Sequence, residues 1–560
     1  MSKDSLVRGT IILTVAALVA RFLGVFQKIP LVHLLGDKGM GSYIIAFNLY
    51  SVLLVVATAG IPSALSKLIS EKTALGRHAE ANRIYRSAII FAIVAGVVMT
   101  LLLYALAPFY AESISGDPRA TLATRAIAPA LLFFPLIAIM RGYFQGRQRM
   151  MPNGISQVVE QIFRLITAVG LAYALLSVST EWAAAGASFG GVAGGLAALA
   201  VMAYFALKLR KEDAGLPSPD GLANARSEIA ASASGVEAHA GMMSYRQIYA
   251  SLLKLSIPIV IFSMTVTLIY NIDSSTIIPL LKHQLDYEQS LELIGILGGR
   301  AQSLAGLPII LAIALSQSVV PIISSAYSRR DLEQVRRQTS RVLQLSILTG
   351  LPIVLMICLA ARPLDGFIFG YEQTEFGYEN GPRMIAWLTL SAMFQIIMQT
   401  SGAVLMGMGR MKPLMLHVAA GIMVKLLGSW LLSPWLGIYG IIFATALCFV
   451  VMSWLNLHAL RKEIRYTILG KRWAGLLSST LIIVLAGFFL EKATHNYVHP
   501  FAIDRINEGI NAAVVGSVVL ALYPLLLMAS RVVTKEDVKN LPAPLQKLIA
   551  RAGRLIGRKV

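Results

Sequence analysis

Residues 9–35 read GTIILTVAALVARFLGVFQKIPLVHLL, and the rest of the chain is best interpreted from this stretch. It is long and apolar enough to cross a bilayer, since a spanning helix needs about 20 apolar residues. It nevertheless carries Arg21 near its middle and Lys28 seven residues later. Positions seven apart lie on one face of a helix, and a cation at the bilayer centre costs roughly 2.5–3.5 kcal/mol on insertion scales. We therefore expect this face to line a cavity that holds an anionic ligand.

The composition excludes an ordinary soluble domain. Of the 560 residues, 56% are hydrophobic and only 14% are charged, and apolar runs of about 20 residues recur along the chain. The formal net charge is +20. Its lysines and arginines lie mostly in short segments between apolar runs, so we attribute the charge to the positive-inside rule and expect no nucleic-acid partner. The two cysteines, Cys358 and Cys448, give neither a metal-ligand spacing nor a disulfide framework.

Fourteen apolar segments are predicted to span a membrane, which makes the chain an all-α polytopic membrane protein. With the N-terminus placed in the cytoplasm, 35 of the 49 lysines and arginines fall in inner segments, seven in outer segments and seven inside spans. This alternation predicts that both termini are cytoplasmic. Spans one, seven and eight exceed the usual length, so we expect each to tilt, bend or lie partly outside the membrane. The predicted spans are 9–35, 42–66, 88–107, 122–140, 155–176, 183–207, 249–280, 293–326, 342–361, 384–406, 414–432, 437–460, 473–490 and 509–530.

Two halves of the chain carry matching motifs. GRQRMMP at 146–152 precedes the fifth span and GMGRMKP at 407–413 precedes the eleventh, while Pro62 and Pro321 lie near the ends of spans two and eight at almost the same offset. Each half has six spans, so both halves share one topology, as in a parallel repeat. The alternative is chance, because Gly, Arg and Pro are common at inner span ends. The predicted parts are an N-terminal lobe at 1–207, a flexible cytoplasmic linker at 208–247, a C-terminal lobe at 248–460, two extra helices at 461–530 and a basic cytoplasmic tail at 531–560.

The basic tail has two interpretations. Leu541, Leu545, Leu548 and Leu555 are interleaved with its lysines and arginines, which favours a surface helix on anionic membrane lipids. A solvated tail that obeys the positive-inside rule fits the same composition.

Cations inside the predicted spans are the first candidates for ligand binding. Arg21 and Lys28 have no acidic residue in their own helix. Arg300 lies in the glycine-containing run ILGGRAQSLAGLP at 296–308, where its planar guanidinium suits two phosphate oxygens. We predict that these three uncompensated cations converge on one cavity and bind a diphosphate. The alternative for Arg300 is an interfacial arginine at the outer end of span eight.

The other cations in spans have simpler explanations. Arg164 follows Glu160 by four residues, and an i,i+4 ion pair on one helix is a sufficient structural reason for both, so they are secondary candidates. Arg125 and Lys254 lie within about a turn of span ends, where a long side chain reaches the interface.

Asp273 lies in a polar run of span seven that extends from Tyr270 to Thr276. Oxygen-rich surroundings suit a bound Na⁺ or a carboxylate that carries a proton. The competing interpretation is a buried ion pair with Lys425 of span eleven or with Arg300. We therefore assign Asp273 and Lys425 to cation coupling or to gating, with Na⁺ at Asp273 as the one metal site considered.

No arrangement typical of catalysis is present in the sequence. Metalloprotease, nucleophile-elbow and Walker motifs are all lacking, so we predict no catalytic residue, no enzyme activity and no cofactor. Work against a gradient would then draw on Na⁺, H⁺ or the membrane potential. A membrane glycosyltransferase remains the alternative from another class, but it would need a large polar outer loop, and the longest predicted one, 362–383, is short.

Three stretches resemble a known family of transporters. RGTIILTVAALVARFLGVFQKIPLVHLLG at 8–36, RGYFQGRQRMMP at 141–152 and LGGRAQSLAGLPIILAIALSQSVVP at 297–321 resemble the MurJ-type lipid II flippases. The greatest likeness is to the Gram-positive YtgP/SpoVB-like branch of the multidrug/oligosaccharidyl-lipid/polysaccharide (MOP) flippase superfamily, and it covers essentially the whole chain. The resemblance implies two six-helix lobes of the MATE/MurJ-like type around a central cationic cavity.

The same resemblance implies a function. A MurJ-type protein moves lipid II, an undecaprenyl-diphosphate-linked peptidoglycan precursor, from the inner to the outer leaflet of the bacterial cytoplasmic membrane by alternating access. The implied partners are this lipid-linked oligosaccharide, membrane lipids and cell-wall polymerase machinery, and a monomer is expected. The alternatives are a flippase for another lipid-linked oligosaccharide, such as an exopolysaccharide, teichoic or spore polymer precursor, and a MATE-type drug/cation antiporter. The antiporter would need an acidic cavity, against which the cations of span one argue.

The family pattern also implies residue roles. Its first-span arginine falls on Arg21, its second cation fits Lys28 with a shift of one residue, and its eighth-span arginine falls on Arg300. A seventh-span aspartate that binds Na⁺ in some relatives matches Asp273. The residues of span eleven depart from that pattern, since Lys425 is not one of the ion's ligands.

Overall fold

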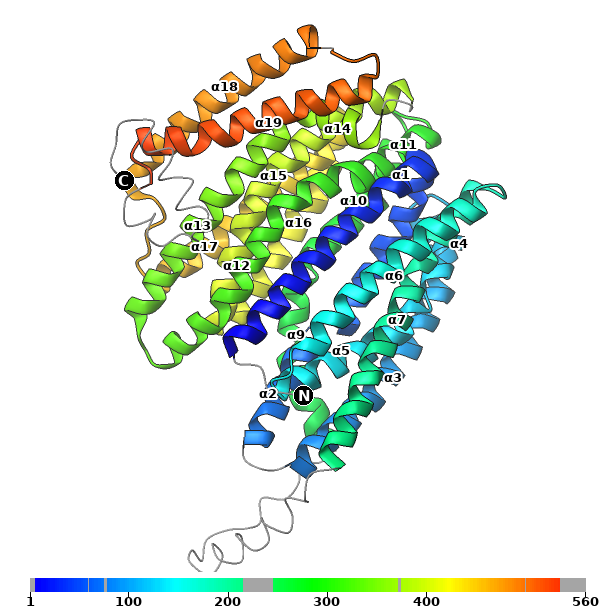
Figure 1. Ribbon diagram of the computed structural model, residues 1–560, viewed down its shortest axis with the longest axis vertical. Coiled ribbons are helices and arrows are strands. Elements are labelled where there is room, and N and C mark those ends of the chain that lie inside the picture. Colours follow the sequence, from blue (N-terminus) through cyan, green and yellow to red (C-terminus); the bar gives the residue numbers. More distant parts are fainter. Residues whose placement is uncertain are drawn as a thin grey trace, which may run out of the picture. The chain divides into compact units, whose positions relative to one another are not determined.

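The chain is an all-helical polytopic membrane protein, and no strand occurs in the part that the computed structural model describes, residues 6–58, 60–74, 78–214, 245–370, 374–498 and 500–533 (Figure 1). The α-helices are α1 (Leu6–Thr58), α2 (Ile61–Ala74), α3 (His78–Pro108), α4 (Ala120–Ile127), α5 (Ala130–Gly146), α6 (Met151–Leu175), α7 (Thr180–Ala214), α9 (Tyr245–Ser263), α10 (Thr265–Leu281), α11 (Tyr287–Gly295), α12 (Gln302–Ser328), α13 (Leu332–Leu359), α14 (Ala361–Phe369), α15 (Glu375–Gly407), α16 (Met411–Leu436), α17 (Ile438–Glu463), α18 (Trp473–Tyr497) and α19 (Asp504–Ala529). Two π-helical turns, η1 (Phe109–Ile114) and η2 (Ile296–Ala301), and a 3-10 turn, η3 (Gly470–Arg472), complete them.

Twelve helical segments of the described residues are long and apolar enough to cross a membrane, and the bent pair α9 and α10 adds a thirteenth if it is one span. The first predicted span and most of the second lie in α1, and the second ends in α2. The backbone of α1 leaves the helical region at Gly36, with φ 62° and ψ 176°. Glycine adopts a positive φ at little cost because it has no Cβ. Gly36 therefore separates two helical arms of α1, one for each predicted span. The orientation of the termini stays a prediction.

The long predicted spans seven and eight are irregular. Span seven consists of α9 and α10, which are bent by 49°. Span eight changes from the α-helix α11 through the π-helical turn η2 to α12. A π-helical turn inserts extra residues into a helix and is frequent at functional sites. Both irregularities place charged or polar side chains that are described below.

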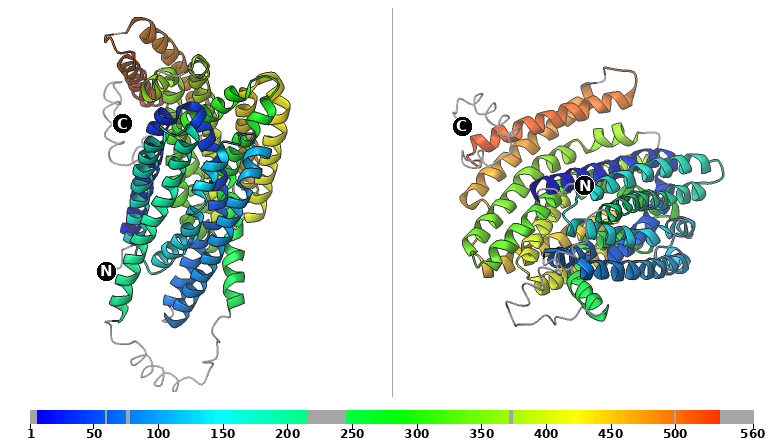
Figure 2. Two further views of the ribbon diagram at one scale, coloured as in Figure 1. Left: turned by 90° about the vertical axis from the view of Figure 1, so that its right-hand side faces the viewer. Right: turned by 60° about the horizontal axis from the view of Figure 1, so that its bottom comes forward.

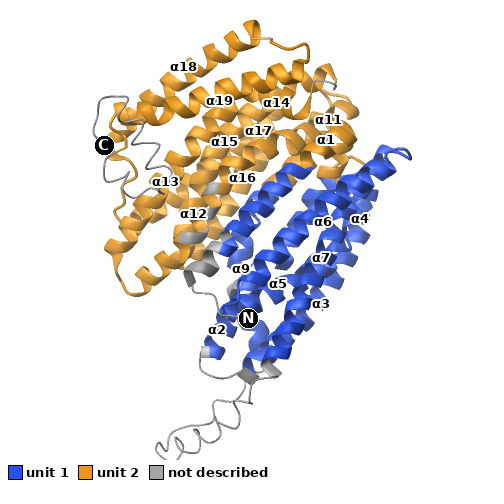
Figure 3. Cartoon of the chain, viewed as in Figure 1, with its two compact units in different colours: residues 1–27, 45–113, 118–268 blue, residues 28–44, 114–117, 269–560 orange. Residues whose placement is uncertain are grey.

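The chain consists of two compact units (Figure 3). Unit 1 comprises residues 1–27, 45–113 and 118–268, and unit 2 comprises residues 28–44, 114–117 and 269–560. The predicted lobe limits stay a prediction. The central part of the predicted linker, 215–244, and the tail from residue 534 lie outside the described residues.

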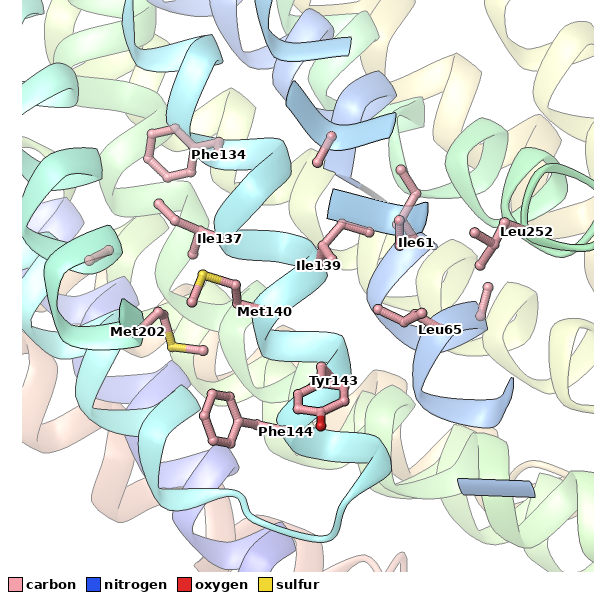
Figure 4. Packing of buried hydrophobic residues seen from close by; sticks show 14 of the residues in the cluster. Ile61, Leu65, Phe134, Ile137, Ile139, Met140, Tyr143, Phe144, Met202 and Leu252 are labelled. Carbon is pink, nitrogen blue, oxygen red and sulfur yellow. The ribbon is translucent and has the colours of Figure 1, made fainter. Parts of the chain in front are cut away.

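The core of unit 1 is built by α2, α3, α5 and α7, with α9 beside α2 (Figure 4). Ile61 and Leu65 of α2 lie near Ile139 of α5 in this cluster. The two helices approach closely because α5 has a glycine at the contact: a Cβ at Gly142 would lie 2.7 Å from the backbone of Pro62. Aliphatic packing of this kind holds membrane helices together through van der Waals contact.

In unit 2, the last two helices pack against α13. A buried cluster joins Leu355 of α13, Ile483 of α18 and Val515 of α19. The helices α18 and α19, at the red end of the colour bar, lie next to each other in both views of Figure 2. They carry the two predicted spans that have no counterpart in the sequence repeat.

Candidate functional site

Arg21 and Lys28 lie seven residues apart on the first arm of α1. Arg21 is exposed and makes no ion pair or hydrogen bond with any residue that the structure describes. Lys28 is half-buried, and its Nζ donates a hydrogen bond to the backbone carbonyl of Gly298, 2.8 Å away. A carbonyl satisfies one donor, and no residue in the described part of the chain provides Lys28 with a counter-charge. Arg21 belongs to unit 1 and Lys28 to unit 2, so their predicted convergence with Arg300 stays a prediction.

Arg300 is buried between two carboxylates, and its side chain is 1% exposed. Its Nε donates to Oδ1 of Asp37 at 2.9 Å, and its Nη2 donates to the other oxygen of the same carboxylate. Its Nη1 donates to Oδ2 of Asp365 at 3.2 Å. We call Asp37, Arg300 and Asp365 the arginine cluster. The expectation that Arg300 is uncompensated is therefore wrong. Its partners were not considered because both carboxylates come from segments that the sequence analysis places outside the spans.

The arginine cluster has little room and a net negative formal charge. Phe369 places its ring centroid 5.9 Å from the guanidinium carbon, and a Cβ at Gly381 would lie 2.6 Å from an oxygen of Asp365. With both carboxylates ionised, the cluster carries one negative charge. Burial, reinforced by the Asp37 carboxylate and opposed by Arg300, raises the pKa of Asp365 to about 6. Arg300 thus offers no free positive charge to a diphosphate while the cluster is intact.

Close backbone packing within unit 2 supports the arginine cluster. A Cβ built at Gly295 of α11 would lie 1.8 Å from the carbonyl oxygen of Asp37, and one at Gly298 would lie 2.5 Å from Ile44. Small residues of this kind allow helices to approach at backbone distance. The chain around the Gly36 break therefore sits directly on α11 and η2.

A third carboxylate, that of Asp117, links further segments of this region. Asp117 is buried and accepts a hydrogen bond from Oγ of Ser42 at 2.6 Å and one from the hydroxyl of Tyr287 at 2.5 Å. Both of these donors are neutral, so each gives the carboxylate a charge-assisted hydrogen bond.

Asp273 and Lys425 form a buried ion pair between α10 and α16. Nζ of Lys425 also donates to the carbonyl of Ile441, 2.8 Å away, and Oγ1 of Thr445 lies 3.3 Å from each oxygen of Asp273. Of the interpretations left open by the sequence, the structure contains the pair with Lys425, while Arg300 is bound elsewhere. No group of three or more His, Cys, Asp or Glu that could hold a metal occurs among the described residues. The Lys425 ammonium faces Asp273 where a cation would lie, so these residues do not fit Na⁺ in addition to Lys425.

Glu160 of α6 is shared by two arginines. Arg164 donates to its Oε1 at 3.1 Å, which is the predicted i,i+4 pair, and Arg141 of α5 donates to its Oε2 at 3.0 Å. Arg141 also donates to Ser156 at 2.9 Å. The predicted pair of Glu160 and Arg164 is confirmed, and the contact with Arg141 adds a structural reason that the sequence analysis did not give.

Sequence reasoning missed Asp37, Asp365 and Arg141 as partners of buried charges. The first two lie 263 and 65 residues from Arg300, and no periodicity links positions so far apart. Arg141 directly follows a predicted span, so the sequence analysis counted it among the cations of the inner segments. The one available signal was the charge itself, since a buried arginine needs a counter-charge from some segment.

The sequence is similar to two protein families and to characterised relatives. The family model described as "Polysaccharide biosynthesis protein" matches residues 6–327, and the one described as "MatE" matches residues 298–431. The lipid II flippase MurJ of Bacillus subtilis (strain 168) is 26% identical over 510 residues, which cover 87% of this chain and 90% of the relative. Stage V sporulation protein B of the same organism is 26% identical over 555 residues, which cover 97% of this chain and 98% of the relative.

Solved structures show the same fold. Lipid II flippase MurJ in an inward closed conformation aligns with a TM-score of 0.62 at 15% identity, covering 92% of this chain and 100% of that one. An inward-facing multidrug resistance MATE family transporter of the MOP superfamily aligns with a TM-score of 0.63 at 13% identity, covering 79% of this chain and 94% of that one. The predicted MATE/MurJ-like, all-helical fold is confirmed by these neighbours.

Proposed function

The chain belongs to the polysaccharide biosynthesis protein family, and from that membership we propose that it moves a lipid-linked saccharide precursor across a membrane. Its relatives and structural neighbours include flippases and transporters, so the chain is a multi-pass membrane transporter and not an enzyme. The precursor that we propose is lipid II, carried from the inner to the outer leaflet of a bacterial cytoplasmic membrane by alternating access. The match to the lipid II flippase MurJ along 90% of its length supports this choice.

One observation carries the proposal: Arg21 and Lys28 have no carboxylate partner among the described residues, whereas the buried cations Arg300 and Lys425 have one. At 1.5 Å per residue, the two cations lie roughly 10 Å apart on one helix face. The insertion cost of roughly 2.5–3.5 kcal/mol for each cation needs a compensating interaction. A diphosphate supplies it, because each charge-assisted hydrogen bond contributes about 1.5–3 kcal/mol.

Arg300 enters the proposal differently. The sequence assigned it to the diphosphate site together with Arg21 and Lys28, but in the structure its donors are bound by Asp37 and Asp365. A diphosphate can reach Arg300 only after these pairs open. We therefore propose that Arg21 and Lys28 make the first contacts with the ligand.

Another lipid-linked oligosaccharide is the second candidate. It is favoured by the match to stage V sporulation protein B, which covers 97% of this chain at the same 26% identity as the match to MurJ. A precursor of a spore, teichoic or exopolysaccharide polymer has the same diphosphate and differs in its sugars, so Arg21 and Lys28 fit both candidates. The energy source proposed for either is H⁺ or the membrane potential, and the proposed partners are membrane lipids and cell-wall polymerase machinery, with the protein acting as a monomer.

Complementation tests the proposed function. We expect the unaltered chain to rescue a bacterial strain depleted of its own lipid II flippase and to restore lipid II at the outer surface. Arg21→Ala and Lys28→Ala should abolish rescue while the protein stays in the membrane. Lys254→Ala is the matched control, since this lysine is exposed and near a span end. Full rescue by Arg21→Ala and Lys28→Ala would contradict the diphosphate site, and a failure of the unaltered chain to expose lipid II would favour another saccharide.

A further inference from the structure

The ammonium of Lys425 contacts the Asp273 carboxylate and the Ile441 carbonyl, and the Thr445 hydroxyl lies beside both; we call these three groups the oxygen shell. The side chain of Lys425 is 0% exposed and that of Asp273 is 2% exposed. Asp273 contributes its carboxylate, Ile441 its backbone carbonyl at 2.8 Å from Nζ, and Thr445 a hydroxyl 3.2 Å from that carbonyl. Ile441 and Thr445 are one helical turn apart on α17, so the carbonyl and the hydroxyl face the same point.

The composition of this shell is that of a cation site. Carboxylate, carbonyl and hydroxyl oxygens are hard ligands, and in transporters they coordinate alkali-metal ions near the middle of the membrane. An ammonium has three donors and no acceptor. It is therefore attracted by the same oxygens that attract an alkali-metal ion. The difference is the four-carbon chain, which fixes the charge to α16.

One further oxygen lies close in the helix and is unused. Ser429 follows Lys425 by four residues on α16, so both lie on one helix face. Its side chain is buried, and its hydroxyl has no hydrogen-bond partner among the described residues. A free ion in place of the ammonium would have this hydroxyl within the same helix turn as a further ligand.

We propose that Lys425 is a tethered cation, whose ammonium fills an oxygen site of the kind that binds an alkali-metal ion. The unaltered chain then takes up no free Na⁺ at Asp273. Truncation of Lys425 turns the same oxygens into a Na⁺ site. The inference goes beyond the proposed function, because it concerns which cation neutralises Asp273 and holds for any transported lipid.

The tether has a mechanical consequence. A free ion leaves its site in each transport cycle and thereby couples the cycle to an ion gradient, whereas an ammonium on α16 stays with the helix. The charge of Asp273 is then neutralised at every stage in which α10, α16 and α17 stay together. A Na⁺ gradient has no ion to drive at this position.

A plain structural ion pair gives different expectations from a tethered cation. If the pair were only structural, the stability of Lys425→Ala would not depend on the cation in the buffer. The stability of Lys425→Met would not depend on that cation either, since both variants leave Asp273 without the lysine's charge. The tethered-cation proposal separates the two variants, because alanine leaves room for an ion and methionine fills the space of the lysine chain.

Thermal stability in detergent, in NaCl and in choline chloride of equal ionic strength, tests the proposal. For the unaltered chain, the melting temperature should be the same in NaCl as in choline chloride. The control Lys254→Ala should likewise show no difference between the two salts. Lys425→Ala should melt lower in choline and rise saturably with Na⁺, because a ligand that binds only the folded state stabilises it by RT ln(1 + [L]/Kd). Lys425→Asn, which adds an amide oxygen, should respond in the same way. Lys425→Met and the double variant Asp273→Asn with Lys425→Ala should not respond.

Direct binding of radioactive Na⁺ gives a second readout. Lys425→Ala should bind one ion per chain and the unaltered protein none at this site. Saturable Na⁺ binding by the unaltered chain that Asp273→Asn abolishes would overturn the proposal, as would Lys425→Ala and Lys425→Asn without any Na⁺ response. If these variants do not survive purification, solubilisation from membranes in either salt decides: recovery only in Na⁺ supports the proposal, and recovery in neither salt overturns it. None of these measurements requires transport, so they fail or succeed independently of the proposed function.

Discussion

Removing the cation of the arginine cluster should destabilise the protein more than removing either carboxylate. Arg300→Met leaves Asp37 and Asp365 buried with no positive charge, and breaking a buried pair by removing one partner typically costs about 3–5 kcal/mol. Asp37→Asn removes the carboxylate that receives two donors of Arg300, but Asp365 still neutralises the guanidinium. Asp365→Asn leaves the two-donor pair with Asp37 intact and should cost least.

The pH dependence follows from Asp365. Burial raises its pKa to about 6, above the unfolded value of about 3.9. A carboxyl whose folded pKa is raised favours the folded state fully below the unfolded pKa, and this contribution is lost as pH rises through the folded pKa. At about 1.4 kcal/mol per pKa unit, the loss between pH 4 and pH 6 is up to roughly 3 kcal/mol. Asp365→Asn cannot ionise and should remove this part of the slope.

Thermal unfolding with a thiol-reactive dye measures both effects. Cys358 and Cys448, the two cysteines of the chain, are half-buried and buried, so the dye reports unfolding without an added label. We expect melting temperatures in the order Asp365→Asn, Asp37→Asn, Arg300→Met, from high to low, and a flatter pH profile for Asp365→Asn from pH 4 to pH 7. If Arg300→Met were as stable as the unaltered chain, the claim that Arg300 neutralises two buried carboxylates would be refuted. An unchanged pH slope in Asp365→Asn would refute the role of Asp365 in the pH dependence.

Three further outcomes are expected. Single cysteines at residue 220 and residue 375, in a chain without its native cysteines, should be labelled from opposite sides of the membrane; labelling from one side would contradict the topology. Gly295→Val should strongly lower the melting temperature, because the added side chain would clash with the carbonyl of Asp37. Gly409→Ala should lower it less, because Gly409 is exposed and has no atom within 4 Å of a built Cβ, although its φ is positive. Glu160→Gln should cost more stability than removing one of its two arginines, because it removes the carboxylate that accepts hydrogen bonds from both of them. Equal melting temperatures would count against this.

The sequence predicts the features that depend on local pattern. Runs of apolar residues indicate the spans, because a helix must satisfy its own backbone in lipid. The pair of Glu160 and Arg164 follows from the four-residue spacing on one helix. The excess length of span seven predicted that it would tilt, bend or lie partly outside the membrane, and the structure shows a bend of 49°.

Features that depend on contacts between distant segments were not predicted in the same way. Asp273 and Lys425 lie in different spans, and their pairing was one of two open interpretations, since an acid and a base embedded in lipid attract each other. Asp37 and Asp365 lie outside the predicted spans, so nothing in the local pattern marked them as partners of Arg300. A break such as that at Gly36 is a property of one φ angle, and glycine alone does not reveal it.

Charge compensation explains why the first arm of α1 is the part of the candidate site most in need of a ligand. Arg300 has two carboxylates and Lys425 has one. Each of these groups would lose an existing pair in order to bind a phosphate. Arg21 has no such pair to lose among the described residues, and Lys28 would exchange one carbonyl contact. We therefore expect an anionic headgroup to gain most at Arg21 and Lys28, and we expect Arg300 to contribute only after its pairs with Asp37 and Asp365 open.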